Sequence, residues 1–228
     1  MHLFFIVILV GFFIFLFTLH YLSNDDLIII RKDMPMEKVF NSAFLAGLVG
    51  LLFSRIFYVI IHPEPVFLNP LGFLLFPYFP GLALSGAVIG GFIFLVFYAR
   101  NQKLPVGRLF DFFSIAILSS LPFGYLGLFL LGGISVIGFI FSFIAYGILF
   151  FAFIKFLLPM SFRNKIKNGS IFAIFLFSFA LVAFLTKVLE EYKNINIINP
   201  ENFLFLGIFI FSLVIILKTE ILGKRVRK

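Results

Sequence analysis

The chain has 228 residues, of which 62% are hydrophobic and 12% charged. Ordinary soluble domains are roughly 45–50% apolar and 25% charged, so this composition excludes a water-soluble fold and indicates that the solvent is lipid. The net charge of +8 does not indicate a nucleic-acid partner, because the basic residues lie between apolar runs and form no single patch.

The usage of cysteine and histidine limits the chemistry that the chain can perform. There is no cysteine, which excludes disulfides, thiolate metal sites and a thiol nucleophile. The three histidines, His2, His20 and His62, lie far apart and outside any metal-ligand spacing. We therefore expect neither a metal site nor a cofactor.

Long apolar stretches recur along the whole chain. A membrane-spanning helix needs about 20 apolar residues, and the stretches that qualify are about 3–22, 39–61, 81–99, 109–130, 134–158, 170–189 and 203–219. The first is predicted to be a retained anchor, because no basic residue precedes it and no small-x-small cleavage site follows it. The sequence therefore predicts an all-α, polytopic integral membrane protein with about seven transmembrane helices in a single domain, 1–228.

The basic residues of the connections predict the orientation. One set of alternate connections, with the C-terminal tail, carries fifteen: Arg31, Lys32, Lys38, Arg100, Lys103, Arg108, Lys155, Arg163, Lys165, Lys167, Lys218, Lys224, Arg225, Arg227 and Lys228. The other set carries two, Lys187 and Lys193. By the positive-inside rule, the N-terminus lies outside and the C-terminus in the cytoplasm.

The predicted outer segment 62–80, HPEPVFLNPLGFLLFPYFP, has five prolines and a strongly apolar body. The prolines exclude a continuous helix, and the apolar side chains disfavour exposure to water. A short half-helix or loop at the outer interface satisfies both constraints. Its role is open between a lid over a lipid-facing cleft and an aromatic anchor without a part in chemistry.

Two charged residues within the apolar runs are candidate site residues, because charge inside a membrane is costly. Arg55 precedes Tyr58 by about one helical turn, so both lie on one face. Together they could bind a lipid phosphate, with the guanidinium as a bidentate donor, or Arg55 could snorkel to the outer headgroups. Asp111 lies three residues after Arg108, near a predicted helix end, and we expect a capping or ion-pair role for it.

Glycines recur at steps of three to five residues within the predicted spans. This spacing lets helix backbones approach closely or lets a lipid chain lie against a helix. Pro122 is expected to open its helix locally, which could expose backbone groups to a cleft. The glycines concerned are Gly47, Gly50, Gly81, Gly86, Gly90, Gly91, Gly124, Gly127, Gly132 and Gly133.

The order of these motifs resembles that of the bacterial prolipoprotein diacylglyceryl transferases. The segment SRIFYVI (54–60) is similar to the family's Arg-x-x-Tyr segment, and PGLALSGAVIGG (80–91) to its Gly-Gly-Leu-Ser-Phe-His-Gly-Gly-x-Ile-Gly stretch. FDFF (110–113) takes the place of an Asp that begins the next span, and FGYLGLFLLGG (123–133) matches the spacing of the signature Gly-Arg-Ile-Gly-Asn-Phe-x-Asn-Gly-Glu. Segment 168–191 follows the family's last pattern.

The resemblance implies a seven-span protein of the bacterial inner membrane. It implies phosphatidylglycerol and a lipoprotein precursor as partners, and transfer of diacylglyceryl from the lipid to the lipobox cysteine thiol of the precursor. In the family, arginines are thought to bind the phosphoglycerol head, and a histidine and neighbouring polar groups to assist the attack of the thiol. The glycines and Asp111 are then structural, namely Gly86, Gly90, Gly124, Gly127 and Gly132.

Most of the family's functional side chains are replaced in this register. Ser85 stands at the histidine position, Tyr125 at the signature arginine, Leu128 at the asparagine, Gly133 at the glutamate, Ala183 at the second arginine and Lys187 at the following glutamate. Two functions follow as alternatives: a transferase with a reduced site around Arg55, Ser85 and Tyr125, or a scaffold that binds a lipid or lipoprotein without reaction. A transporter is disfavoured, because runs three, five and seven nearly lack charged or polar residues.

Overall fold

The computed structural model describes residues 2–24, 35–69, 72–73, 81–163, 165–190 and 200–218. Every regular element in this part of the chain is a helix. Contacts divide the protein into two compact units, one of Met1–Met34 with Gly107–Lys228 and one of Pro35–Val106. The single domain over 1–228 stays a prediction.

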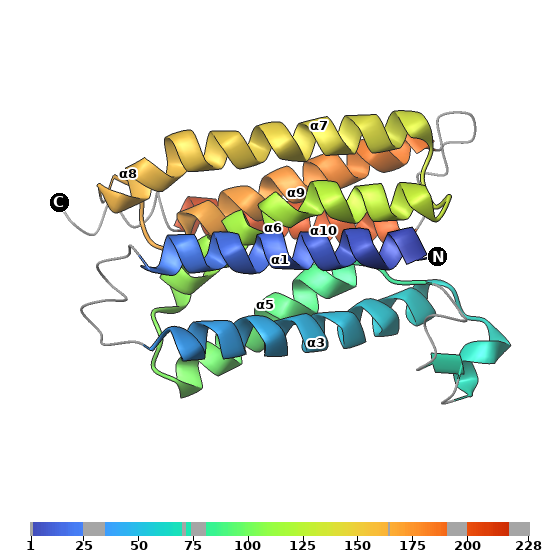
Figure 1. Cartoon of the computed structure of the whole chain (residues 1–228), viewed down its shortest axis with the longest axis horizontal. Coiled ribbons are helices and arrows are strands. Elements are labelled where there is room, and N and C mark those ends of the chain that lie inside the picture. The colour runs from blue at the N-terminus through green and yellow to red at the C-terminus, as the bar shows by residue number, and fades with distance from the viewer. Residues whose placement is uncertain are drawn as a thin grey trace. The chain divides into compact units, whose positions relative to one another are not determined.

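The larger unit is a bundle of long apolar helices. They are α1 (His2–Asn24), α6 (Val106–Leu130), α7 (Val136–Ala152), α9 (Ser170–Glu190) and α10 (Pro200–Ile216). A π-helical turn (Phe153–Leu157) joins α7 to the short α8 (Leu158–Phe162). Figure 1 shows α7 running beside α9, in the opposite direction. Gly132, at a φ of +71°, follows the end of α6. Pro159 lies in the first turn of α8, a position that proline favours.

The smaller unit consists of two antiparallel helices, α3 (Met36–Ile61) and α5 (Leu84–Asn101), with a 3-10 helix at Pro65–Leu68 between them. Gly86 and Gly90 let the two helices approach each other closely. A Cβ added at Gly90 would overlap the Cβ of Phe53, and one at Gly86 would lie 2.7 Å from the Cβ of Phe57. The glycine spacing therefore provides close helix packing here.

The prediction of an all-helical polytopic membrane protein is confirmed. Among the described residues, six helices are long and apolar enough to cross a membrane, and the seventh predicted span appears as the shorter apolar helix Pro200–Ile216. Pro122 lies inside α6, which is assigned as one helix from Val106 to Leu130. The predicted connections 23–38 and 187–202, the C-terminal tail and segment 62–80 fall partly outside the described residues, and the orientation stays a prediction.

Candidate functional site

Arg55 is buried near the end of α3, with 3% of its surface exposed. Its guanidinium donates three hydrogen bonds to backbone carbonyls: Nε to Phe73 at 3.0 Å, Nη1 to Gly81 at 2.8 Å and Nη2 to Gly72 at 2.9 Å. A guanidinium has five N–H donors, so three of the five are used by backbone carbonyls between Gly72 and Gly81. In this structure Arg55 fixes the path of the chain that follows α3.

Aromatic rings enclose the same guanidinium. The Arg55 Cζ lies 4.7 Å from the centroid of the Phe67 ring and 5.9 Å from that of Tyr58, within the range of a cation–π interaction. Tyr58 also stacks on His62, with ring centroids 4.7 Å apart. A Cβ added at Gly81, which has a φ of +151°, would overlap the Tyr58 ring. Position 81 therefore requires glycine on both conformational and steric grounds.

Ser85 lies in the first turn of α5 and is 2% exposed. Just before α5, Ala83 N donates a backbone hydrogen bond of 3.1 Å to the carbonyl of Ser54 in α3. Ser54 immediately precedes Arg55, so the end of α3 and the start of α5 are tied together by backbone as well as by the guanidinium. Of the predicted site residues, Arg55, Tyr58, Ser85, Gly86 and Gly90 share this smaller unit.

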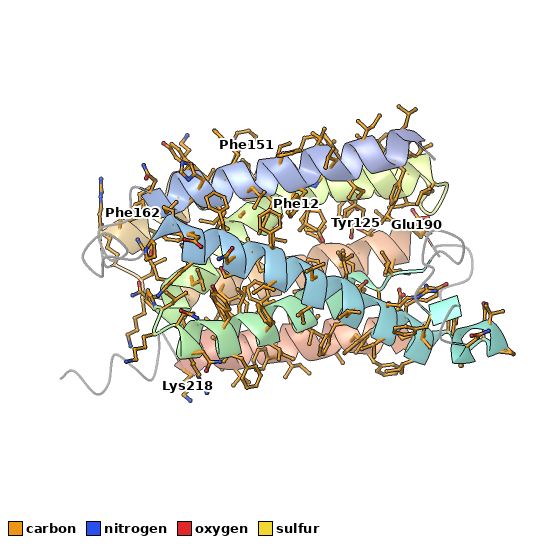
Figure 2. The ribbon with its side chains drawn as sticks, turned by 60° about the horizontal axis from the view of Figure 1, so that its bottom comes forward. Phe12, Tyr125, Phe151, Phe162, Glu190 and Lys218 are labelled. Carbon is orange, nitrogen blue, oxygen red and sulfur yellow. The ribbon has the colours of Figure 1, made fainter. Side chains whose placement is uncertain are left out.

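Tyr125 belongs to the larger unit and is buried in α6, 6% exposed. Its ring stacks on Tyr146 of α7 with centroids 5.3 Å apart, and the Tyr146 hydroxyl donates to the Phe179 carbonyl at 3.5 Å. Figure 2 shows Tyr125 toward the end of this unit at which α9 finishes with Glu190. Tyr125 therefore contributes to an aromatic stack between α6 and α7.

The glycines predicted to be structural in α6, Gly124 and Gly127, and just after it, Gly132, have different surroundings. A Cβ at Gly127 would lie 3.2 Å from Ile8 Cδ1 of α1, whereas Gly124 has open space within 4 Å. Gly132 has a φ of +71° and ends the helix, with its N–H donating to the Phe129 carbonyl at 3.0 Å. Only Gly127 therefore serves close packing of α6 against α1.

Asp111 is fully buried in α6 and caps α9. Its Oδ2 accepts from Gly169 N at 2.8 Å and its Oδ1 from Phe172 N at 3.0 Å. These are N–H groups at the start of α9, which have no acceptor within their own helix, and the positive end of the helix dipole favours a carboxylate there. Arg108, one turn earlier, donates to the Ser161 hydroxyl and lies over the rings of Phe112 and Phe162.

A second carboxylate cap, at the other end of α9, was not predicted from the sequence. Glu190 Oε1 accepts from the Ser135 hydroxyl at 2.6 Å, and both carboxylate oxygens accept from Ser135 N at 3.0–3.1 Å. Ser135 in turn caps α7 by accepting from Gly138 N at 3.1 Å. A serine just before an apolar run is a recognisable helix start, but nothing local in the sequence pairs it with Glu190.

Polar pairs between helices were also missed. Lys187 Nζ lies 2.5 Å from Glu201 Oε2, joining α9 to α10. The hydroxyls of Ser142 and Thr186 are 2.8 Å apart, and Thr18 donates to Ser119 at 3.1 Å. Single hydroxyl residues in apolar runs give no sign of their partners, since a serine or threonine can equally bond its own helix backbone.

Comparison with known proteins places these features in a family. The family model described as prolipoprotein diacylglyceryl transferase matches residues 1–218. The chain belongs to this family. A phosphatidylglycerol–prolipoprotein diacylglyceryl transferase of Clostridium tetani is similar to the chain, with 26% identity over 102 residues. The similar part covers 45% of this chain and 40% of that relative. The chain therefore matches less than half of the length of the relative.

Membership of the prolipoprotein diacylglyceryl transferase family confirms the resemblance seen in the motifs. It agrees with the apolar helices in assigning the chain to multi-pass membrane proteins. The roles of Arg55, Tyr58, Ser85 and Tyr125 stay predictions. The hydrogen bonds of Arg55 hold the backbone that follows α3, and those of Asp111 hold the start of α9.

Proposed function

We propose that this chain is a non-transferring member of the diacylglyceryl transferase family, a scaffold in the bacterial inner membrane that binds an anionic phospholipid. The observation that supports the proposal is how the charged side chains buried in the described spans are used. Arg55 donates to three carbonyls, Asp111 accepts from two N–H groups, and Arg108 donates to a serine between two rings. Each charge is satisfied by groups that hold helices together.

The family reaction makes a demand that these residues do not meet. A cysteine thiolate must attack the diacylglyceryl carbon while the bond to the glycerol phosphate breaks, so the thiol must lose its proton and the departing phosphate must be stabilised. Loss of one preorganised donor commonly costs about 3–4 kcal/mol of transition-state stabilisation, two to three decades in rate. Ser85, Tyr125 and Ala183 replace a histidine and two arginines in the proposed register, so even non-additive losses leave negligible turnover.

The lipid that the proposal assigns is phosphatidylglycerol, taken from the family's chemistry and from the name of the clostridial relative. Arg55 and Tyr58 are the proposed contacts for its phosphate. The phosphate would take the two N–H groups that the three carbonyls leave on the guanidinium, or it would displace one carbonyl. A lipoprotein precursor is the second proposed partner, bound without reaction.

The deciding experiment is transfer to a lipobox peptide. Purified protein in detergent with phosphatidylglycerol is incubated with the peptide, and the diacylglyceryl adduct is measured by mass spectrometry. We expect no adduct, while native mass spectrometry detects bound phosphatidylglycerol. A protein that binds no phosphatidylglycerol would contradict the scaffold proposal.

The alternative is a transferase that works with a reduced set of polar residues at the family positions, namely Arg55, Ser85 and Tyr125. Robust adduct formation by the unmodified chain, or growth and lipidated precursor when it replaces a conditional transferase, would establish this alternative. A triple variant, Ser85→His with Tyr125→Arg and Ala183→Arg, tests the register. Some turnover by this variant, with none by the parent, supports both the register and the loss of chemistry.

A further inference from the structure

The connection from α8 to α9 carries positive charge with no acidic residue nearby in sequence. Arg163 and Lys165 are exposed there, and Lys155 is exposed on the π-helical turn before α8. The chain has no acidic residue between Asp111 and Glu190. Both oxygens of Asp111 accept from the start of α9, and Glu190 lies at the opposite end of that helix. We use the name basic connection for these three cations: Lys155 just before α8, and Arg163 and Lys165 just after it.

Backbone hydrogen bonds hold the main chain at Arg163 and at Lys165. Arg163 N donates to the Pro159 carbonyl at 3.0 Å, and Lys165 N donates to the Met160 carbonyl at 2.9 Å. The far side is held by the Asp111 bond to Gly169 N. The side chains of Arg163 and Lys165 therefore extend from hydrogen-bonded backbone, so less entropy is lost when an anion binds than in a flexible loop.

Exposed apolar side chains lie beside these cations. Phe156 is 60% exposed, Phe162 is 44% exposed and Met160 is 39% exposed. The ammonium of Lys155 lies 5.7 Å from the centre of the Phe156 ring. Figure 2 shows Phe162 and Lys218 at the same end of the larger unit. A protein surface that binds an anionic membrane typically places cations at the depth of the headgroups and apolar side chains beside them, at the boundary with the acyl chains.

We infer that the basic connection is a binding site for the phosphate of an anionic phospholipid in the leaflet on its own side, predicted to be cytoplasmic. The planar guanidinium of Arg163 suits a bidentate phosphate, and the two lysines add point charges. This inference does not depend on the proposed function, since it involves neither Arg55 nor the outer segment.

The absence of tryptophan from the chain allows a local test. The Phe162→Trp variant carries a single fluorophore beside Arg163, and it is reconstituted into vesicles of phosphatidylcholine with brominated phosphatidylglycerol, or with brominated phosphatidylcholine in parallel. Stronger quenching by the anionic lipid reports its enrichment at this site. The Phe203→Trp variant, on α10 and 60% exposed, is the matched reporter at the other end of the unit.

The charges are then removed by Arg163→Gln with Lys165→Gln in each reporter. We expect the preference for the anionic lipid at position 162 to fall about fivefold or more, given the strength of attraction per cation near a membrane surface, and the reporter at position 203 to be unchanged. The charge-keeping pair Arg163→Lys with Lys165→Arg should retain most of the preference, which separates loss of charge from loss of fold. Lys218→Gln is the control for one exposed cation at the same end.

Salt and free phosphate complete the test. The preference of the parent reporter should weaken with added sodium chloride, because exposed charges are screened. Inorganic phosphate should weaken it only as much as chloride of equal ionic strength. A preference that survives the double Gln substitution would overturn the inference, and excess displacement by inorganic phosphate would assign the cations to a free anion and overturn the lipid assignment.

Discussion

Replacing Arg55 by methionine removes every donor from a site where three backbone carbonyls depend on them, while it keeps an unbranched apolar stem. Each hydrogen bond to a charged group contributes about 1.5–3 kcal/mol, and the cost of burying the guanidinium, several kcal/mol, offsets part of the sum. We therefore expect a net loss of about 2–4 kcal/mol, confined to the end of the smaller unit where α3 finishes and α5 begins. The Lys variant should lie between, since an ammonium lacks the planar fork.

A cysteine-free chain makes this loss measurable at single positions. Ala83, 4% exposed, lies beside the Arg55 site, and Ala99, fully buried, lies near the far end of α5. With a single Ala83→Cys reporter, a loss of about 2–4 kcal/mol should speed thiol labelling in detergent by about 30-fold to several hundred-fold. Labelling of an Ala99→Cys reporter should hardly change.

Two results would refute this account of Arg55. Equal protection of the Ala83→Cys reporter with and without the Arg55→Met substitution would mean that the three carbonyl bonds do not hold the segment. Equal acceleration at Ala99→Cys would mean that the whole unit depends on Arg55. If the segment is unchanged but phosphatidylglycerol is lost in native mass spectrometry, Arg55 serves the lipid alone.

Three further predictions concern topology and packing. Single cysteines in place of Glu64 and Lys103 should be labelled from outside and from the cytoplasm, respectively, and the reverse would overturn the orientation. Asp111→Ala removes the cap of α9 and should lower the free energy of unfolding by about 1–2 kcal/mol. The detergent-solubilised protein should then unfold at a lower temperature, with a smaller decrease for Asp111→Asn. Gly90→Val should destabilise the protein by more than about 2 kcal/mol through overpacking, whereas Gly47→Ala, with nothing within 4 Å, should be neutral.

Much of the fold was predictable because spans are set by length and apolarity. The run predicted at 39–61 appears as Met36–Ile61, and the run at 109–130 as Val106–Leu130. Helix starts extend beyond the apolar runs because first turns can hold polar residues such as Glu37. The π-helical turn at Phe153–Leu157 could not be predicted, since its residues have the same apolar pattern as the helix before it.

The candidate site was predictable only in part. The rarity of charge within apolar runs identified Arg55 and Asp111, and this signal holds in any membrane protein. Their partners were not predictable, because the carbonyls of Gly72, Phe73 and Gly81 and the N–H of Gly169 are backbone groups that every sequence possesses. Which backbone group meets a side chain is decided by the path of the chain.

A charged side chain buried within a membrane needs partners that stabilise it, since the cost of burying it without partners is about 3 kcal/mol or more. The kind of compensation bears on function. Arg55 and Asp111 are compensated by backbone groups of the segments that they hold. A catalytic group must instead keep bonding capacity for charge that develops in the transition state. Three of the five N–H groups of Arg55 hold the chain that enters α5. Transfer chemistry at Arg55 would have only the remaining two N–H groups, or would require the guanidinium to release that chain, and holding the chain is the use that its three bonds favour.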